Sequence, residues 1–218
     1  CRPGPDTEAG DADLSLLSYL ECCDKSFAEY QKRVNDADFA RTFGYLCFHT
    51  PFGGMVKGAH RTMMRRLAKA SPAQIEEDFN RRMMPGLAFS QRVGNTAGAS
   101  VFFALAGLLQ TAEITEPQRV GFFSYGSGCC SEFYSGVVTP GSQALFRALM
   151  VAEALVRRYR LSMDEYELLL QGEHVVRFGT RAMEIDHQLI PAARQAFDGT
   201  GRLVLDRVKN YHREYSWV

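Results

Sequence analysis

The sequence has no apolar run of the roughly 18 to 20 residues that a helix needs to cross a bilayer, so we expect no membrane-spanning segment. It has no excess of charge of either sign, because 25 Lys and Arg residues balance 25 Asp and Glu residues. Since binding to nucleic acid depends on a basic surface, this balance argues against a nucleic-acid partner. The 218 residues are 46% hydrophobic and 23% charged, which is the composition of an ordinary globular protein of one or two domains.

The six cysteines include no Cys-x-x-Cys motif. Two pairs are sequence neighbours, Cys22 with Cys23 and Cys129 with Cys130, and neighbouring residues make poor disulfides. We therefore predict reduced cysteines and a cytoplasmic setting. Cys129 and Cys130 fall within a strand pattern, which favours buried packing over a role as nucleophiles.

Motifs for several common chemistries are also missing. No cluster of His, Cys, Asp or Glu has metal-ligand spacing, and no glycine-rich phosphate loop or Ser-His-Asp order stands out. We expect no metal and no resident cofactor. The chain starts at Cys1 without an initiator methionine, and residues 1–6 have the character of the interior of a longer chain, so we expect a fragment.

Helix and strand patterns alternate along the chain, which predicts an α/β fold. Residues 1–13 read as a leading loop rich in Pro, Gly and Asp, and Asp13 is expected to cap the first helix. Capping boxes at Ser71 and Ser162 each predict the start of a helix. The expected elements are helices over residues 13–34, 54–69, 72–84, 101–109 and 142–158, a short helix after Ser162, strands over 43–48 and 202–206, and a hairpin of strands over 119–125 and 129–138. The strand over 202–206 is expected to be the last one.

Three segments share one pattern, a polar side chain beside glycines at the end of a strand or the start of a helix. They are His49 with Gly53 and Gly54, Asn95 with Gly94, and Ser127 between Gly126 and Gly128. Glycine lets a substrate approach the backbone, and helix amino ends supply donors for oxyanions. An imidazole, an amide and exposed backbone N–H groups together suit carbonyl chemistry, with His49 polarising or protonating an oxygen that Asn95 helps to hold.

Each of these residues also has a structural explanation when it is taken alone. A histidine at a strand end is often a satisfied structural residue, and Gly94-Asn95 is ordinary turn chemistry. Lys57 is by default a solvated charge on a helix, and His60 is a core or surface residue rather than a ligand. The residues by themselves leave both explanations open.

The order of the motifs adds information that no single motif carries. Along the chain stand Phe48-His49-Thr50-Pro51-Phe52, then Val93-Gly94-Asn95-Thr96, then Phe123-Ser124-Tyr125-Gly126-Ser127-Gly128. In this order they resemble the carboxyl-terminal half of 3-hydroxy-3-methylglutaryl-CoA synthase. Residues 2–13 and 127–134 most resemble the polyketide-pathway members, which install β-branches on chains bound to carrier proteins. The resemblance covers most of the chain and weakens after about residue 138.

The resemblance implies one half of a thiolase-like α/β fold, with a mixed sheet flanked by helices, and a homodimer. It divides the chain into a leading loop (1–13), a core with the active-site loops (14–139), and a helical insertion with a closing strand (140–218). It also implies an aldol-type condensation, in which an acetyl group attacks the β-ketone of an acyl thioester. The substrates are then carried on the phosphopantetheine of an acyl carrier protein or of CoA.

Roles for single residues follow from the same resemblance. His49 matches the histidine that polarises and protonates the acceptor ketone oxygen, and Asn95 matches the asparagine near the thioester carbonyl. Ser127 matches the serine of the glycine turn, and we place Tyr125 and Gly126 with it among the substrate-binding residues. Lys57 stands where the family has a basic residue near the entrance for the phosphopantetheine arm.

The family's nucleophilic cysteine and its glutamate base belong to the amino-terminal half, and no cysteine here has a comparable context. We therefore expect this chain to position an acceptor and to need that missing half and acyl carrier proteins as partners. Two alternatives stay open. One is the primary-metabolism synthase that uses acetyl-CoA and acetoacetyl-CoA, and the other is a non-catalytic thiolase-fold module that binds carrier proteins.

Overall fold

The computed structural model describes residues 10–126, 128–171, 176–177 and 179–218. The chain folds as two compact units, one of Asp11–Ala152 and one that includes Glu153–Val218. Among the described residues, no helix is long and apolar enough to cross a membrane. The domain bounds expected from the sequence, 1–13, 14–139 and 140–218, stay a prediction.

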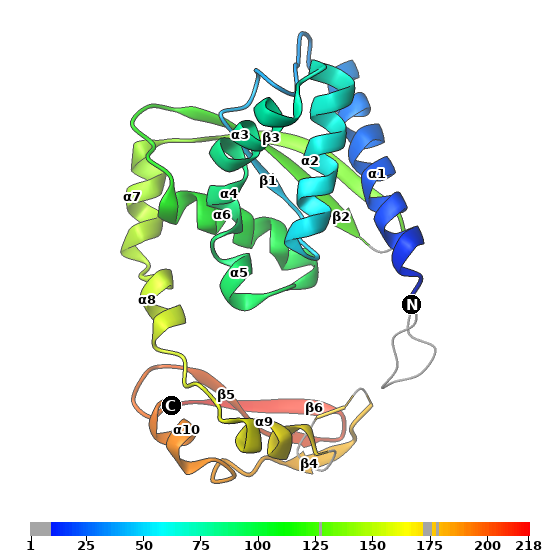
Figure 1. Cartoon of the computed structure of the whole chain (residues 1–218). Coiled ribbons are helices and arrows are strands. Elements are labelled where there is room, and N and C mark those ends of the chain that lie inside the picture. The colour runs from blue at the N-terminus through cyan, green and yellow to red at the C-terminus, as the bar shows by residue number, and fades with distance from the viewer. Residues whose placement is uncertain (1–9, 127, 172–175, 178) are drawn as a thin grey trace. The chain divides into compact units, whose positions relative to one another are not determined.

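The first unit is built on a mixed sheet with the strand order β1-β2-β3 (Figure 1). Its strands are β1 (Tyr45–Phe48), β2 (Gln118–Gly126) and β3 (Cys130–Val138). β1 runs parallel to β2, with Phe48 opposite Phe123, whereas β2 and β3 form an antiparallel pair. The predicted hairpin and the predicted mixed sheet are therefore confirmed.

Helices pack on both faces of this sheet, because its strands carry apolar side chains on both faces (Figure 1). On one face, Phe48 and Phe123 join a core with residues of α1, α2 and α3. On the other face, Val120 and Phe122 pack with residues of α6. The helices of this unit are α1 (Ala12–Arg33), α2 (Gly53–Ala68), α3 (Pro72–Arg82), α4 (Met84–Leu87), α5 (Ser90–Val93), the 3₁₀ turn η1 (Ala97–Ala99), α6 (Ser100–Thr111) and α7 (Pro140–Ala148). α8 (Val151–Val156) follows α7.

The structure confirms one of two helix starts predicted from local sequence and corrects the other. The capping box at Ser71 is present, with the Ser71 side chain and the Gln74 side chain each bonded to the other's backbone N–H. The first helix, however, is capped by Asp11, whose side chain accepts a hydrogen bond from the Leu14 N–H. The prediction of Asp13 as the cap was therefore wrong; Asp13 lies in the first turn, where its charge favours the helix amino end.

The single helix predicted over residues 142–158 is two helices, α7 and α8. α7 begins earlier than expected because Thr139 and Ser142 form a capping box and Pro140 fits the first helical turn. The break follows from Met150, which has a φ of 54° in the left-handed region and so interrupts the helix. Apolar periodicity continues across this break, which is why the pattern alone misses it.

The second unit contains a small antiparallel sheet of β4 (Ala182–Glu184), β5 (Leu203–Lys209) and β6 (His212–Trp217), with helices α9 (Met163–Leu170) and α10 (Pro191–Gln195). The capping box at Ser162 opens α9 as predicted. The predicted strand at 202–206 is β5, but it is not the last one. Asn210 and Tyr211, both with positive φ, form a two-residue turn into β6, whose mostly polar sequence hides it from an apolar pattern.

A buried ionic network ties α2 to α3. The Asp78 carboxylate accepts hydrogen bonds from Arg82 (Nη2 to Oδ2, 2.6 Å) and lies 2.7 Å from His60 Nε2. Arg82 and His60 are fully buried. The Arg82 Nη1 group also donates to the carbonyl oxygen of Phe39, 2.8 Å away, in the segment that leads into β1.

Burial alone would raise the pKa of the Asp78 carboxyl, but hydrogen bonds from His60 and Arg82 outweigh that effect and hold the pKa well below its ordinary value of 3.8. The folded chain therefore keeps Asp78 ionised at a pH where the unfolded chain protonates it. The stability that results is present above the ordinary pKa and is lost as the pH falls toward the folded-state pKa. His60 is thus a core residue, which is one of the two alternatives that the sequence left open.

We predict that Arg82→Met lowers the free energy of unfolding by about 3 to 5 kcal/mol, because it leaves the buried Asp78 charge without its main partner. Arg81→Met is the matched control: Arg81 also contacts Asp78, at 2.9 Å, but its side chain is 62% exposed, so the loss should stay below about 1 kcal/mol. Urea denaturation of both variants measures the difference. Equal losses would contradict a dominant role for the buried pair.

Candidate active site

His49 lies directly after β1, at the carboxyl edge of the parallel pair. Its backbone N–H donates to the Phe123 carbonyl at 2.8 Å, so the ladder between β1 and β2 extends to this residue. Its own carbonyl accepts a hydrogen bond of 2.6 Å from the hydroxyl of Tyr19 in α1. With both backbone groups bonded, the position of the imidazole is set by the sheet and by α1.

The His49 side chain is buried, and one of its ring nitrogens is engaged. Nδ1 lies 2.8 Å from the hydroxyl oxygen of Ser100, the first residue of α6. The same Ser100 oxygen accepts the Thr50 backbone N–H at 3.0 Å. Ser100 and Tyr19 are the site residues that the sequence analysis missed, because a serine at a helix start and a tyrosine on an apolar helix face have no distinctive pattern.

Tyr125 is brought beside His49 by β2. The two ring centroids are 5.9 Å apart, and Tyr125 also packs edge-on against Tyr19 at 5.4 Å. Gly126 ends the strand one residue later and is exposed. Ser127 lies outside the described residues. Of the residues that the sequence placed at the site, the structure thus puts Tyr125 in contact with the imidazole and Gly126 next to it in the chain.

Asn95 lines a cavity of about 260 Å³ next to the His49 loop. Its side-chain oxygen accepts the Ala97 N–H at 2.8 Å, which orients the amide at the start of the 3₁₀ turn. The cavity shares Thr50, the neighbour of His49, with the imidazole site. Its lining residues are Thr50, Pro51, Phe52, Gly53, Leu87, Ser90, Gln91, Gly94 and Asn95. Through Thr50, the cavity that Asn95 lines therefore adjoins the loop that carries His49.

Lys57 projects from the exposed face of α2. Its ammonium nitrogen lies 2.8 Å from a carboxylate oxygen of Glu76 in α3 and 5.4 Å from the ring centre of Phe79. It does not line the Asn95 cavity. The structure therefore shows Lys57 as a paired surface charge, and its proposed place near the substrate entrance stays a prediction.

The prediction that Cys129 and Cys130 are buried was wrong, because both are exposed. Cys129 sits in the hairpin turn with a φ of 59°, and Cys130 is the first residue of β3. The Cys22 thiol, by contrast, lies beneath the turn, 3.9 Å from the Cys129 carbonyl oxygen. Burial raises the pKa of the Cys23 and Cys47 thiols well above the ordinary value, so both stay protonated and poorly nucleophilic.

Burial lowers the pKa of the His49 imidazole below its ordinary value of 6.5. Burial also raises the pKa of the Tyr19 phenol well above 10.0, so that phenol stays a neutral donor to the His49 carbonyl. A neutral imidazole with one nitrogen bonded to Ser100 keeps the other nitrogen for a ligand. Such a group polarises a carbonyl oxygen or exchanges a proton with it.

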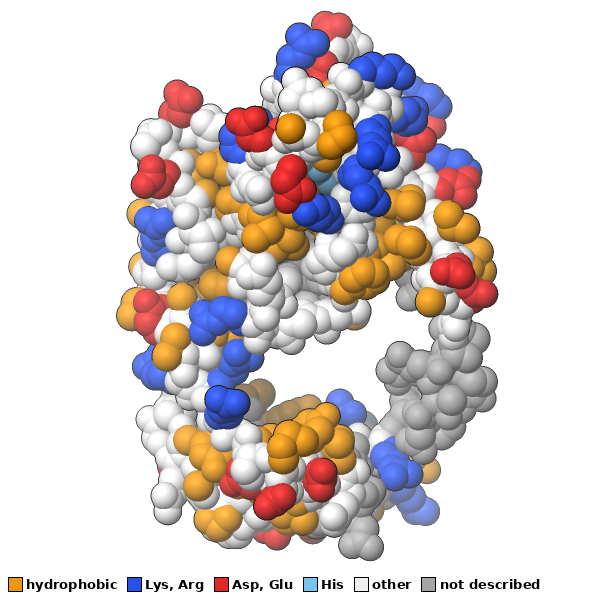
Figure 2. All heavy atoms as spheres, in the orientation of Figure 1, with side chains coloured by type: hydrophobic (Ala, Val, Ile, Leu, Met, Phe, Trp, Pro, Cys, Tyr) orange, Lys and Arg blue, Asp and Glu red, His pale blue; other side chains and the backbone are white. Residues whose placement is uncertain are grey.

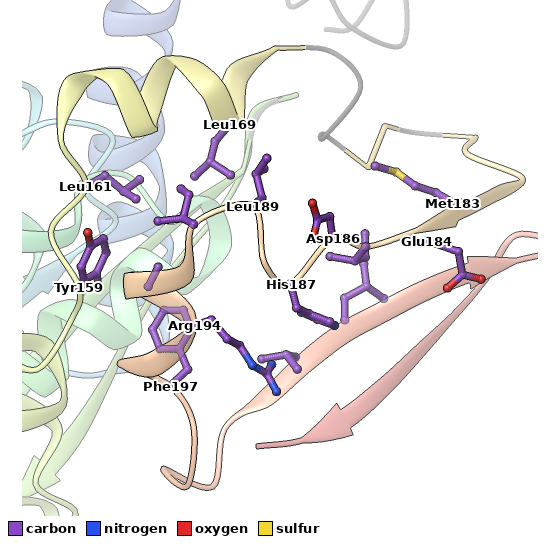
Figure 3. A pocket seen from close by; sticks show the side chains of 15 residues that line it. Tyr159, Leu161, Leu169, Met183, Glu184, Asp186, His187, Leu189, Arg194 and Phe197 are labelled. Carbon is purple, nitrogen blue, oxygen red and sulfur yellow. The ribbon is translucent and has the colours of Figure 1, made fainter.

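A second cavity, of about 520 Å³, lies within the unit that includes Glu153–Val218 (Figure 3). Leu161, Leu169, Leu189 and Phe197 give it a largely apolar wall, while His187 pairs with Asp206 at 3.0 Å nearby. None of the site residues predicted from the sequence lines this cavity. Within the described part of the chain, no group of three or more His, Cys, Asp or Glu residues is placed to hold a metal ion.

Comparison with known proteins places these residues in a family context. The family model described as "Hydroxymethylglutaryl-coenzyme A synthase C terminal" matches residues 61–215. The chain is 55% identical over 218 residues to the polyketide biosynthesis 3-hydroxy-3-methylglutaryl-ACP synthase PksG of Bacillus subtilis, covering all of this chain and 52% of that protein. It is 31% identical over 160 residues to the hydroxymethylglutaryl-CoA synthase of Enterococcus faecalis, covering 73% of this chain and 40% of that one.

Solved structures give the same picture for the fold. The HMG synthase of the curacin biosynthetic pathway superposes with a TM-score of 0.97 at 56% identity, covering all of this chain and 54% of that one. The same synthase in complex with a holo donor-ACP gives a TM-score of 0.96. The predicted thiolase-like α/β fold and the resemblance drawn from the motifs are thereby confirmed. The chain spans about half the length of the curated relatives it matches.

We predict that His49 titrates with a midpoint below 6.5, because burial disfavours the imidazolium form. Its ring signals followed by NMR against pH measure the midpoint, and His49→Gln identifies them among the five histidines. The unfolded chain binds this proton at a higher pH than the folded chain does, so His49 reduces stability as the pH falls through 6.5. A midpoint at or above 6.5 would contradict the burial argument.

Proposed function

Because the chain belongs to the hydroxymethylglutaryl-coenzyme A synthase family, we propose that it is the acceptor-binding part of a polyketide β-branching synthase. The reaction is the condensation of an acetyl group with a β-ketoacyl thioester on an acyl carrier protein. One observation carries this proposal most directly: the buried His49, held at the edge of the sheet with Nδ1 engaged and Tyr125 beside it. That arrangement presents the remaining ring nitrogen to a carbonyl oxygen.

The roles proposed for single residues follow from their places. His49 polarises the acceptor ketone and supplies a proton as its oxygen becomes an alkoxide. Tyr125 closes one side of the imidazole, and the Asn95 amide, fixed by its bond to the Ala97 N–H, faces the thioester end of the acceptor. Gly126 and Ser127 belong to the sequence motif Gly126-Ser127-Gly128 that resembles the family's, and we assign them to substrate binding on that ground. In this proposal the nucleophilic cysteine and its glutamate base come from the half of the fold that the relatives carry in addition.

Carrier proteins, rather than CoA, as the carriers of the substrates are supported by two independent observations. The relatives at 55% and 56% identity are a polyketide HMG-ACP synthase and a synthase crystallised with a donor-ACP, whereas the CoA-using relative from Enterococcus faecalis is 31% identical. The second observation is a basic stripe, which we define as Lys57, Arg61, Arg65 and Lys69. All four are exposed and spaced every four residues, the first three on α2 and Lys69 directly after its last residue. Figure 2 shows Lys and Arg side chains gathered over this helix.

The basic stripe begins beside the loop that carries His49 and runs away from it along α2. An acidic carrier protein lying against the stripe would deliver its phosphopantetheine arm toward that loop. Complementary charge of this kind mainly speeds association and fixes orientation. Lys57 lies at the end of the stripe nearest the loop. In this proposal it contacts the phosphopantetheine arm at the substrate entrance, as the family resemblance implies, and leaves its ion pair with Glu76 to do so.

We keep three further expectations as parts of this proposal. The substrates arrive on phosphopantetheine with no resident cofactor, the synthase is a homodimer, and the setting is a reducing, cytoplasmic one. The last of these is supported by five described cysteines that are all free, Cys22, Cys23, Cys47, Cys129 and Cys130.

We expect Arg61→Glu combined with Arg65→Glu to weaken carrier-protein binding by about tenfold or more, mainly through slower association. The probe is an acyl carrier protein of the kind bound in the curacin synthase, and surface plasmon resonance gives both rates. Arg157→Glu combined with Arg160→Glu, exposed residues elsewhere, changes the net charge equally and serves as the control. Equal weakening by both pairs would show that net charge matters and the stripe does not.

We expect His49→Ala, in the complete synthase with both halves of the fold, to slow condensation by about 10² to 10⁴-fold. Transfer of acetyl to the cysteine should persist, because the proposed role of His49 lies on the acceptor side. Single-turnover assays with labelled acetyl separate the two steps. If both steps fall together, the acceptor role assigned to His49 is wrong.

The primary-metabolism synthase that uses acetyl-CoA and acetoacetyl-CoA remains the second candidate, favoured by the similarity to the Enterococcus faecalis enzyme. Turnover of the complete synthase on CoA thioesters and on carrier-protein thioesters distinguishes the two enzymes. A carrier-protein preference supports β-branching, and a CoA preference supports primary metabolism. Binding of carrier protein without any turnover would identify the non-catalytic module instead.

A further inference from the structure

We propose that Ser100 is a positioning residue that selects the protonation form of His49. Its hydroxyl donates to Nδ1, which leaves the ring proton on Nε2, the nitrogen that faces the acceptor. The consequence for catalysis rests on the proposed function. The position of the proton on the His49 ring, however, is a property of the folded chain. It is therefore testable without any substrate.

The geometry at Ser100 leaves its hydroxyl little freedom. The oxygen lies 2.8 Å from Nδ1 of His49 and 3.0 Å from the Thr50 backbone nitrogen, and the residue is fully buried. A backbone N–H is always a donor, so the contact with Thr50 uses one acceptor site of the serine oxygen. What remains to be placed is the serine's own proton.

Counting donors and acceptors assigns that proton. Among the described residues, Nδ1 of His49 is the only acceptor that the structure offers the Ser100 hydroxyl. If Nδ1 carried a proton, the serine proton would be buried with no partner, and an unsatisfied buried donor is costly. If Nδ1 is bare, the Ser100 hydroxyl donates to it and accepts from the Thr50 N–H, so both hydrogen bonds of the serine are made. The neutral ring then carries its single proton on Nε2.

Ser100 holds this position through the backbone of α6. Ala104 and Leu108 follow it at intervals of four residues on the same helix face, and both are buried in the core cluster that also contains Cys47 and Phe122. α6 is therefore fixed against the sheet whose edge carries His49. The hydroxyl is placed by a rigid element rather than by a loop, as accurate positioning requires.

The form with the proton on Nε2 is the one that the proposed reaction needs. An N–H directed at the acceptor ketone stabilises the negative charge that develops on its oxygen, and a neutral imidazole can act in this way. The opposite form would direct a lone pair at that oxygen and repel it. Ser100 thus contributes to the reaction without touching the substrate.

The direct test is nitrogen NMR on the chain with ¹⁵N-labelled histidine, at a pH where His49 is neutral, with His49→Gln to assign its signals. In the wild-type chain we expect Nε2 to give the signal of a protonated nitrogen and Nδ1 that of a bare one. Ser100→Thr keeps the hydroxyl and should preserve this pattern, whereas Ser100→Ala should give a mixture of both forms. A wild-type ring with its proton on Nδ1 would overturn the proposal, whether or not Ser100→Ala folds.

The kinetic test uses the complete synthase. Loss of the partner that orients a metal-bound histidine costs about 10 to 100-fold in activity, and we take the same range for the partner that orients His49. We therefore expect Ser100→Ala to slow condensation by that factor and to leave cysteine acetylation unchanged, with recovery in Ser100→Thr. Equal condensation rates in wild type and Ser100→Ala, with melting temperatures unchanged, would refute the positioning role. If His49→Ala leaves condensation intact while NMR shows the proton on Nε2, the proposed function fails and the assignment of the proton stands.

Discussion

The parallel pairing of β1 with β2 is the constraint on which the rest of the first unit depends. Two parallel strands need a long crossover between them, and here the crossover contains α2 to α6. Parallel strands also end at the same edge of the sheet. His49 after β1 and Tyr125 near the end of β2 therefore meet, although 76 positions separate them in the sequence numbering. The site is a direct product of strand direction.

The crossover is itself held by interactions that place the site. Arg82 in α3 binds the backbone just before β1, while its carboxylate partner Asp78 contacts His60 in α2. The start of the strand and the first two crossover helices thereby form one buried network. At the other end of the crossover, Ser100, the first residue of α6, is hydrogen-bonded to the His49 imidazole. A strand that is four residues long is in this way fixed at both of its ends by groups from elsewhere in the chain.

Local patterns predicted much of this unit, because capping boxes, apolar strands and glycine turns act over a few residues. The family was visible for a similar reason, since its motifs are short and keep their order. The contact between Ser100 and His49 was not predictable, because it joins residues 51 positions apart and involves a serine with no local signal. The exposure of Cys129 and the break at Met150 each depend on one left-handed residue that an apolar pattern ignores. In the second unit, the polar sequence of β6 gave little periodicity to recognise.

The bond between Tyr19 and the His49 carbonyl has a consequence for observing the protein. The Tyr19 phenol is fully buried, its pKa is raised well above 10.0, and its proton is committed to the backbone of the catalytic candidate. Tyrosine changes its ultraviolet absorption when it ionises, and Tyr19 is one of nine tyrosines that contribute to that change. In an alkaline titration, we expect the Tyr19 share of that change only at a pH where the phenol is freed from the His49 carbonyl, and Tyr19→Phe identifies that share. The chain therefore contains its own indicator of whether that edge of the sheet is closed or open.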